Sequence, residues 1–369
     1  MAGHAVRPVL IQKTRQRIIM KKQTLRRAAA LCCAALLLAG ACSGCGRSFT
    51  ERTAFAMGSV LTARIYAPEE QAEKLFGRIT DGVNGVDRRI SATNPDSPVY
   101  AANHTGSSNA DAYTLNKLGD IVMVCNILNG TVDPTVGALT ELWGFSSDTP
   151  RKPTDGEIQA ALETVGLEKL LLDDVNGSII LSEGQKLDPG AFGKGIALDE
   201  AYLALHTATY SAVVTFGGSV LLFGAPKSGK SWTVGIRDPF KGENDSFATL
   251  SLTPDDDNYV GYLSTSGSYE KNFTENGVTY HHILSPETGY PVETDLVSVT
   301  VCAGGGLSSD ALSTACFING LNETTLRWLK SFGAEAVFVN KDKQYYITDG
   351  LKDCFTLNDD SFSPMDHEG

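Results

Sequence analysis

Residues 298–319 read SVTVCAGGGLSSDALSTACFIN, and residues 281–289 shortly before them read HHILSPETG. The later stretch begins as an apolar, β-like run, passes through three glycines and continues as a helix-like run. Asp310 and Thr314 are four residues apart, so on a helix they share one face. A carboxylate and a hydroxyl together are oxygen ligands of the kind that Mg²⁺ prefers. Taken alone, the stretch also fits a simpler interpretation, in which Ser308 to Asp310 only cap the helix.

The composition permits a large core and argues against nucleic-acid binding. The chain has 369 residues, 42% of them hydrophobic, which suits one or two domains. Its formal net charge is −12 at pH 7, and no basic patch alternates with aromatic residues. Nucleic acid is therefore not expected as a partner.

The basic residues are concentrated at the N-terminus. Residues 1–41 hold eight Lys and Arg and no Asp or Glu, and the last four of these basic residues precede an uncharged stretch from Ala28 to Ala41. A basic segment followed by a short apolar one is typical of an export signal. The apolar run is too short for an ordinary membrane-spanning helix, which needs about 20 residues.

The signal ends in the sequence LAGAC at residues 38–42, where small residues before a cysteine resemble a bacterial lipobox. We expect Cys42 to become the lipid-modified first residue of the mature protein, anchored on the extracytoplasmic side of a bacterial cell membrane. A plain signal peptide cut nearby, with Cys42 incidental, is the alternative. Met20 also begins a compact signal by itself, and residues 1–19 would then be an extension of the gene model.

The part of the chain after the signal is expected to form one domain of the α+β class. Residues 42–50 would be a tether, residues 51–350 the domain and residues 351–369 an acidic C-terminal tail. Apolar periodicity predicts helices mixed with strands and hairpins, with mixed sheets and packed helices. Helices are expected at residues 68–86, 112–128, 154–165, 196–208, from 309 onward and at 322–332. Strands are expected at residues 60–66, 179–187, 212–223, 232–237 and 297–302, with a terminal hairpin at 336–339 and 344–348 and a loop at 91–107.

Four cysteines lie in this domain or its tail: Cys125, Cys302, Cys316 and Cys354. None belongs to a CxxC pair or has the spacing of a metal site. Cys125 and Cys316 stand in apolar runs and are expected to be buried thiols. A Cys302–Cys316 disulfide is possible outside the cytoplasm, but it is not the favoured interpretation.

Residues 224–231, GAPKSGKS, match the phosphate-binding P-loop pattern letter for letter. That motif needs a helix after the loop, because the helix N-terminus receives the phosphate. Residues 232–237 instead alternate like a strand. We therefore interpret the match as a hairpin loop.

Ser268 and Lys271 match the SxxK pattern of penicillin-binding enzymes. That motif requires a later Lys-Thr-Gly on a strand, and the nearest candidate, Glu287-Thr288-Gly289, lacks the lysine. An acyl-transfer enzyme of this kind is kept as a remote alternative.

Five clusters combine polar side chains with glycines, which let a ligand approach the backbone. In the cluster at residues 187–199, N–H groups at a helix start and Lys194 could neutralise a diphosphate. Each cluster alone has an ordinary interpretation, such as a turn at Asp133 or a half-buried surface position for His282. Their joint occurrence favours one shared ligand site. The clusters lie at residues 56–59, 130–145, 187–199 and 215–219, and at 264–268 together with 281–286 and 309–314.

In order and spacing, these clusters resemble the ApbE-type FAD:protein FMN transferases, from about Thr53 to Thr348. The motifs are Met-Gly-Ser, Asp-Pro-Thr-Val-Gly with Leu-Trp-Gly-Phe, Asp-Pro-Gly-x-x-Gly-Lys-Gly, Gly-Gly, Thr-Ser-Gly, His-Ile-x-x-Pro-x-Thr-Gly and Asp-Ala-Leu-x-Thr-Ala. The resemblance implies a T-fold-like domain that cleaves FAD, releases AMP and esterifies FMN to a Thr or Ser hydroxyl of a partner protein. It also implies Mg²⁺ as the metal and exported or membrane electron-transfer flavoproteins as acceptors. Family members are commonly exported lipoproteins.

The resemblance also implies roles for individual residues. His282 would take the proton from the acceptor hydroxyl, Lys194 would add positive charge, and Asp310 would act with the metal. The metal would be held by Asp310, Thr314 and the backbone carbonyl of Ala191. The positions that match FAD contacts are Met57, Thr93, Asp133, Asp188, Lys194, Gly217, Gly218, Thr265 and Leu284.

Three positions depart from the family pattern. Ser285 replaces a common Asp, Ser219 replaces a frequent Asp or Asn, and Thr93 stands where an aromatic ring often meets the flavin or adenine. Asp310, Thr314, Lys194 and His282 are intact, so we expect an active enzyme. Two alternatives to FMN transfer stay open: a pyrophosphatase that cleaves FAD to FMN and AMP, and a FAD-binding lipoprotein without chemistry.

Overall fold

The computed structural model describes residues 49–226 and 229–366. The expected export signal and Cys42 lie outside these residues, as does part of the GAPKSGKS motif. No helix in the described part of the chain is long and apolar enough to cross a membrane.

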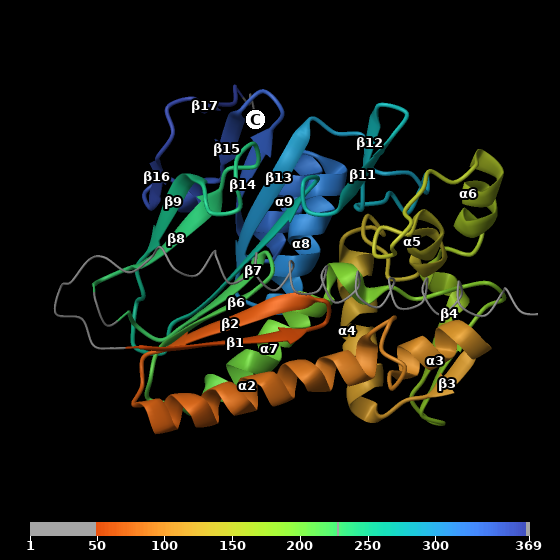
Figure 1. The fold of residues 1–369 in the computed structure, drawn as a ribbon, viewed down its shortest axis with the longest axis horizontal. Helices are drawn as coiled ribbons and strands as arrows, with labels where there is room; N and C mark the ends of the chain where they lie inside the picture. The colour runs from red at the N-terminus through yellow and green to blue at the C-terminus, as the bar shows by residue number, and fades with distance from the viewer. Residues whose placement is uncertain (1–48, 227–228, 367–369) are drawn as a thin grey trace, which may run out of the picture. The chain divides into compact units, whose positions relative to one another are not determined.

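One large sheet of nine strands runs through the described residues and organises the domain (Figure 1). Its neighbouring strands pair antiparallel, except β15 and β17, which pair parallel. Successive residues of a strand point to opposite faces, so the apolar run at 296–303 places side chains in the cores on both sides of the sheet. In spatial order the strands are β1 (Thr50–Ala56), β2 (Ser59–Ile65), β6 (Ala212–Phe216), β7 (Ser219–Phe223), β10 (Val260–Gly267), β13 (Leu296–Ala303), β14 (Glu335–Asn340), β15 (Gln344–Ile347) and β17 (Ser363–Pro364).

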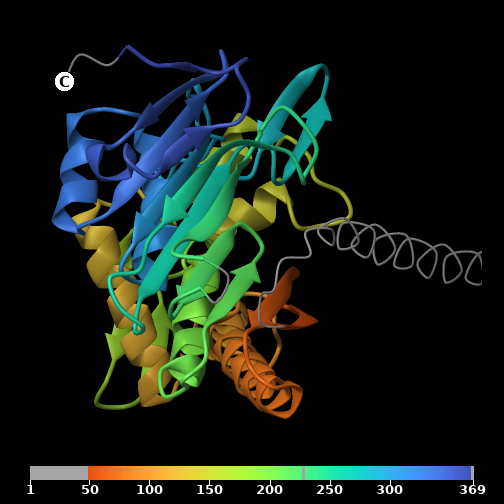
Figure 2. The ribbon, with the colours of Figure 1, turned by 90° about the vertical axis from the view of Figure 1, so that its left-hand side faces the viewer.

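Helices cover one face of this sheet. α7 (Gly193–Leu205) contacts α8 (Gly306–Asn319), and α8 packs on β10 and β13. α2 (Glu69–Ile90) lies beside α7 in both views (Figures 1 and 2). α2 has acidic residues in its first turn and basic residues in its last, which complements the helix dipole. α9 (Glu323–Ser331) follows α8 and is capped by Asn322, as its sequence favours.

A small sheet covers the other face, in the order β16 (Phe355–Leu357), β9 (Ser246–Leu252) and β8 (Trp232–Arg237). Leu221 belongs to the core cluster on the helical side, whereas its neighbour Leu222 packs with Trp232 and Phe247 on the side of the small sheet. The domain is therefore layered as helices, large sheet and small sheet, with apolar cores in both interfaces.

The remaining elements lie around the helical layer. They are α3 (Pro98–Thr105), α4 (Ala112–Ile127), α5 (Gly137–Trp143), α6 (Asp155–Leu162), the three-stranded sheet β3 (Ser107–Asn109), β5 (Ser178–Leu181) and β4 (Leu170–Asp173), and the hairpin β11 (Asn272–Glu275) with β12 (Val278–His281). Short 3-10 helices are η1 (Leu167–Lys169), η2 (Pro189–Ala191) and η3 (Asp349–Leu351).

The α+β class expected from the sequence is confirmed, but several boundaries differ. The expected loop at 91–107 contains α3, because Ser97 caps a helix that begins with Pro98. The single strand expected at 212–223 is a hairpin of β6 and β7, because Gly217 turns the chain with a φ of 58°.

The expected acidic tail needs correction, because residues 351–366 belong to the fold. β16 pairs with β9, and Phe362 is only 3% exposed. Residues 351–366 contain short apolar stretches between their charged residues, and these stretches pack into the core on the small-sheet side.

The four cysteines of the described part are free thiols. Cys316 belongs to the core on the helical side of the large sheet, while Cys302 packs on the opposite side. The sheet therefore separates the two sulfurs of the Cys302–Cys316 disulfide that the sequence left open.

Candidate active site

The centre of the candidate site is the meeting point of the first turns of α7 and α8. Asp310 in α8 is 3% exposed, and its Oδ2 accepts a hydrogen bond from the backbone N–H of Gly195 in α7 at 2.9 Å. Its Oδ1 lies 3.8 Å from Nζ of Lys194, also in α7. This is an ion pair beyond ordinary hydrogen-bond distance. One oxygen of Asp310 is thus fixed by the backbone, and the other can still bind a cation.

The surroundings of Asp310 fit a charged ligand. Burial raises the pKa of Asp310, whereas Lys194, nearby backbone N–H groups and Ser219 oppose that rise. The buried Oγ of Ser219 is near enough to act on Asp310, but it makes no hydrogen bond of ordinary geometry in the described part of the protein. A buried carboxylate beside a hydroxyl that makes no hydrogen bond of ordinary geometry is an environment that a bound cation or phosphate would complete.

Two further oxygen donors lie next to Asp310. Thr314 is one turn later on α8, and its Oγ1 lies 3.0 Å from Oγ of Ser266 in β10. Ala191 ends η2, which contacts both α7 and α8. A carboxylate, a hydroxyl and a carbonyl are the donor types that Mg²⁺ accepts. No group of three or more His, Cys, Asp or Glu side chains in the described residues could hold a metal by itself.

His282 lies just after β12 and is held by its main chain. Its N–H donates to the carbonyl of Lys271 at 3.0 Å, and its buried Nδ1 has no hydrogen-bond partner among the described residues. Burial lowers the pKa of His282 to about 4, and the charges of Lys271 and Lys194 add to this effect. The imidazole is therefore neutral near pH 7 and able to accept a proton.

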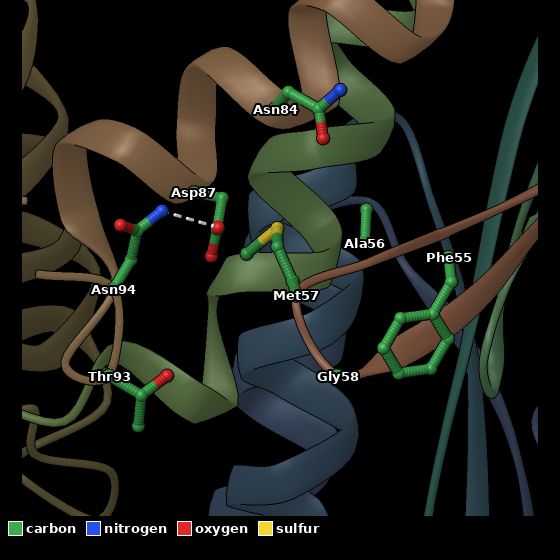
Figure 3. Close-up of a pocket in the computed structure, with 8 residues that line it drawn as sticks. All are labelled: Phe55, Ala56, Met57, Gly58, Asn84, Asp87, Thr93 and Asn94. Atoms are coloured by element: carbon green, nitrogen blue, oxygen red, sulfur yellow. Dashed lines mark hydrogen bonds between the residues drawn. The ribbon is translucent and has the colours of Figure 1, made fainter. Parts of the chain in front are cut away.

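Met57 and Thr93 line one pocket of about 340 Å³ between the end of β1, the turn that follows it, α2 and the loop after α2, with Phe55, Asp87 and Asn94 (Figure 3). Met57 has a φ of 45°, a conformation that residues other than glycine rarely adopt. Asn94 donates to Asp87 at 2.7 Å. The ring of Phe55 is exposed at the pocket and is labelled beside Gly58 in Figure 3.

The pocket and the α7–α8 junction are neighbours. A Cβ added to Gly193, the first residue of α7, would lie 3.1 Å from the terminal methyl of Met57. The absence of a side chain at Gly193 therefore lets Met57 approach the start of α7.

The Gly-Gly and Thr-Ser-Gly motifs meet beside Lys194. The N–H of Thr265 donates to the carbonyl of Gly218 at 3.0 Å, and Oγ1 of Thr265 lies 2.9 Å from Oγ1 of Thr300. A Cβ added to Gly217 would lie 3.4 Å from Cδ of Lys194. The tight turn between β6 and β7 therefore leaves the lysine side chain its space.

Asp133 and Asp188 lie together at the entry to η2. The N–H of Asp188 donates to the carbonyl of Pro134, and its Oδ1 accepts from Gly190. Asp133 accepts two hydrogen bonds from Thr135, and burial raises the pKa of its carboxyl. These bonds support the turn interpretation of Asp133, so its contact with FAD stays a prediction.

Leu284 is not among the residues that line the Met57 pocket. It is 6% exposed and packs with Leu139, Trp143 and Ile158. Its role at the FAD site also stays a prediction.

Sequence reasoning missed several polar residues of the site. Ser266 was only part of a motif, yet its hydroxyl lies between those of Ser313 and Thr314. Lys271 was noted only for the SxxK pattern, but its main chain and charge both act on His282. In the structure Ser268 contacts the Val297 carbonyl and Lys271 contacts Ser146, which gives the acyl-transfer alternative no support.

The chain is similar to known proteins in sequence and in fold. A model of the ApbE family matches residues 57–338. FAD:protein FMN transferases of Treponema pallidum and Klebsiella pneumoniae are 29% and 30% identical to this chain, covering 88% and 77% of it and 93% and 85% of their own lengths. The crystal structure of the ApbE protein of Thermotoga maritima matches with a TM-score of 0.76 at 28% identity, covering 83% of this chain and 99% of that chain. This chain therefore belongs to the ApbE family.

Proposed function

We propose that this protein transfers FMN from FAD to a Thr or Ser hydroxyl of a target flavoprotein and releases AMP. The relatives that carry the name of this activity match the chain over most of their length. One observation carries the proposal. The buried carboxylate of Asp310 pairs with the partly exposed ammonium of Lys194, whose charge also acts on the neutral imidazole of His282. Phosphoryl transfer depends mainly on positioning and on neutralising charge, which these groups provide.

The chemistry follows from the positions of these residues. Lys194, whose side chain is 33% exposed, neutralises the diphosphate of FAD. His282 takes the proton of the acceptor hydroxyl as that oxygen bonds to the phosphorus of FMN, and the bond from this phosphorus to AMP breaks. Asp310, Thr314 and the Ala191 carbonyl would hold Mg²⁺, which would stabilise charge on the leaving phosphate.

We further propose that the enzyme acts outside the cytoplasm. The basic and apolar pattern of residues 1–41 and the small residues before Cys42 support an exported, lipid-anchored protein. The acceptor would then be an exported or membrane electron-transfer flavoprotein.

The test uses protein without residues 1–42, incubated with FAD, Mg²⁺ and an acceptor domain that carries a candidate threonine. We expect the intact mass of the acceptor to rise by one FMN, and EDTA to abolish the gain. Release of AMP and free FMN without this gain would support the pyrophosphatase alternative. FAD binding without turnover would support a carrier.

A further inference from the structure

α7 and α8 cross through two copies of the same pattern, Gly-x-x-x-Asp. α7 supplies Gly195 and Asp199, and α8 supplies Gly306 and Asp310. The N–H of Gly195 donates to Asp310 at 2.9 Å, and the N–H of Gly306 donates to Asp199 at 2.7 Å. Each helix therefore binds the first turn of the other with a carboxylate placed one turn after its own glycine.

The two glycines make this reciprocal arrangement possible. A Cβ on Gly195 would lie 2.1 Å from the Gly306 carbonyl oxygen, and a Cβ on Gly306 would lie 2.2 Å from the Gly195 carbonyl oxygen. The backbones touch at this point, so a small rotation of either helix would disturb both carboxylate contacts.

The two carboxylates differ in what remains available to a ligand. Both oxygens of Asp199 accept backbone hydrogen bonds, Oδ1 from Gly306 and Oδ2 from Leu307 at 3.0 Å, and the Tyr262 hydroxyl also bonds to this carboxylate. Asp310 accepts a hydrogen bond at Oδ2 from Gly195, while its Oδ1 lies 3.8 Å from Nζ of Lys194, and the Lys194 N–H and Ser219 also stabilise its charged form. Both oxygens of Asp199 are thus occupied by backbone hydrogen bonds, whereas Oδ1 of Asp310 faces the Lys194 ammonium and can also bind a cation.

We propose that Asp199 is a positioning residue that sets the orientation of Asp310 toward a divalent cation. This inference rests on the proposed function, which places the cation at Asp310. Asp199 fixes Gly306 and Leu307, and Asp310 follows Gly306 by one turn of the same helix. The direction of the free Oδ1 of Asp310 is therefore determined by a residue that does not touch the cation. Partners of metal ligands commonly affect metal affinity in this way.

The substitution Asp199→Asn tests this role. The new amide group can accept a hydrogen bond from only one of the two N–H groups, and its own NH₂ would oppose the other. The matched control is Asp111→Asn, because Asp111 is a carboxylate that caps α4 and accepts from Thr114 N at 2.8 Å. A second variant, Tyr262→Phe, removes one hydrogen bond from Asp199 and keeps the ring.

The readouts are Mn²⁺ binding measured by electron paramagnetic resonance and the unfolding temperature of the metal-free protein. We expect Asp199→Asn to weaken Mn²⁺ binding by about 10- to 100-fold. Tyr262→Phe should weaken it several-fold, and Asp111→Asn should leave it unchanged. If Asp199→Asn does not fold, Tyr262→Phe and its metal affinity decide the question.

The outcomes separate this inference from the proposed function. Unchanged Mn²⁺ affinity in the folded Asp199 and Tyr262 variants, with only a lower unfolding temperature, would reduce Asp199 to an ordinary helix cap and overturn the proposal. If Asp310→Ala binds Mn²⁺ as well as the wild-type protein, the metal is not at Asp310, and the proposed function loses its metal site.

Discussion

At the scale of single residues, Asp310 should be decisive for both metal binding and transfer. Asp310→Asn keeps an oxygen for the Gly195 N–H but removes the charge from the buried site. We expect FMN transfer to fall by about 100-fold or more, because changes to the outer partners of metal ligands already cost about 10- to 100-fold. The measurement is acceptor mass over a range of Mg²⁺ concentrations, with circular dichroism as the control for folding. Transfer at the wild-type level would rule out Asp310 as the metal ligand.

The lowered pKa of His282 predicts how the rate of FMN transfer depends on pH. Its pKa is lowered from 6.5 to about 4, chiefly by burial. A lowered pKa keeps the imidazole neutral, so base catalysis should persist as the pH falls and be lost only near pH 4. Lys271→Met removes a charge that opposes protonation and should move this acidic limb upward. The measurement is the rate of FMN transfer from pH 4 to 8.

The control for Lys271→Met is Lys330→Met, an exposed lysine on α9. This variant should leave the pH profile unchanged. His282→Asn should lower the rate by about 10²- to 10⁴-fold, the usual contribution of a general base. A wild-type limb centred near 6.5 would contradict the assignment of His282.

At the scale of elements, the crossing of α7 and α8 should tolerate no side chain at its glycines. A Cβ on Gly306 would lie 2.2 Å from a backbone oxygen that cannot move independently. We expect Gly306→Ala to lower the free energy of unfolding by about 1–3 kcal/mol, the usual cost of overpacking, and to abolish transfer. Urea unfolding and the transfer assay measure the two effects.

Gly77 provides the matched control, because it lies on the exposed side of α2 with no atom within 4 Å of an added Cβ. Gly77→Ala should stabilise the protein by about 1 kcal/mol, since alanine favours the helix. Equal effects of the two substitutions would show that the α7–α8 contact is looser than the structure indicates.

The same elements show what the sequence could and could not predict. Periodicity located α2, α4 and α9, because each has a clear apolar stripe or a capping residue. It missed α3, whose Ser97-Pro98 start also suits a turn. Asp310 and Thr314 were recognisable because they share one helix turn. The role of Asp199 depends on contact with a helix more than 100 residues away, which no local pattern contains.

At the scale of the whole molecule, the C-terminal segment should contribute to the stability of the folded domain. The sequence predicted an acidic tail at residues 351–369, where Asp and Glu outnumber Lys and Arg. In the structure the ring of Phe362 stacks on Phe247 with centroids 4.5 Å apart, and β16 closes the small sheet. A separate tail and an integrated segment differ in their effect on unfolding.

Phe362→Ala distinguishes these two cases. Because Phe362 is 3% exposed, its loss should lower the free energy of unfolding by about 3–5 kcal/mol, as for other buried aromatic side chains. Phe240→Ala is the control, since Phe240 contacts the same ring but is 41% exposed and should cost about 1 kcal/mol or less. Urea unfolding followed by tryptophan fluorescence reports both, because Trp232 lies in the same core cluster. An unchanged midpoint for Phe362→Ala would mean that the segment detaches without loss and that the domain ends near residue 350. A large loss of unfolding free energy would place the end of the folded domain at or beyond Phe362. The C-terminal segment would then stabilise the domain through the small sheet, on the face of the large sheet opposite the helices.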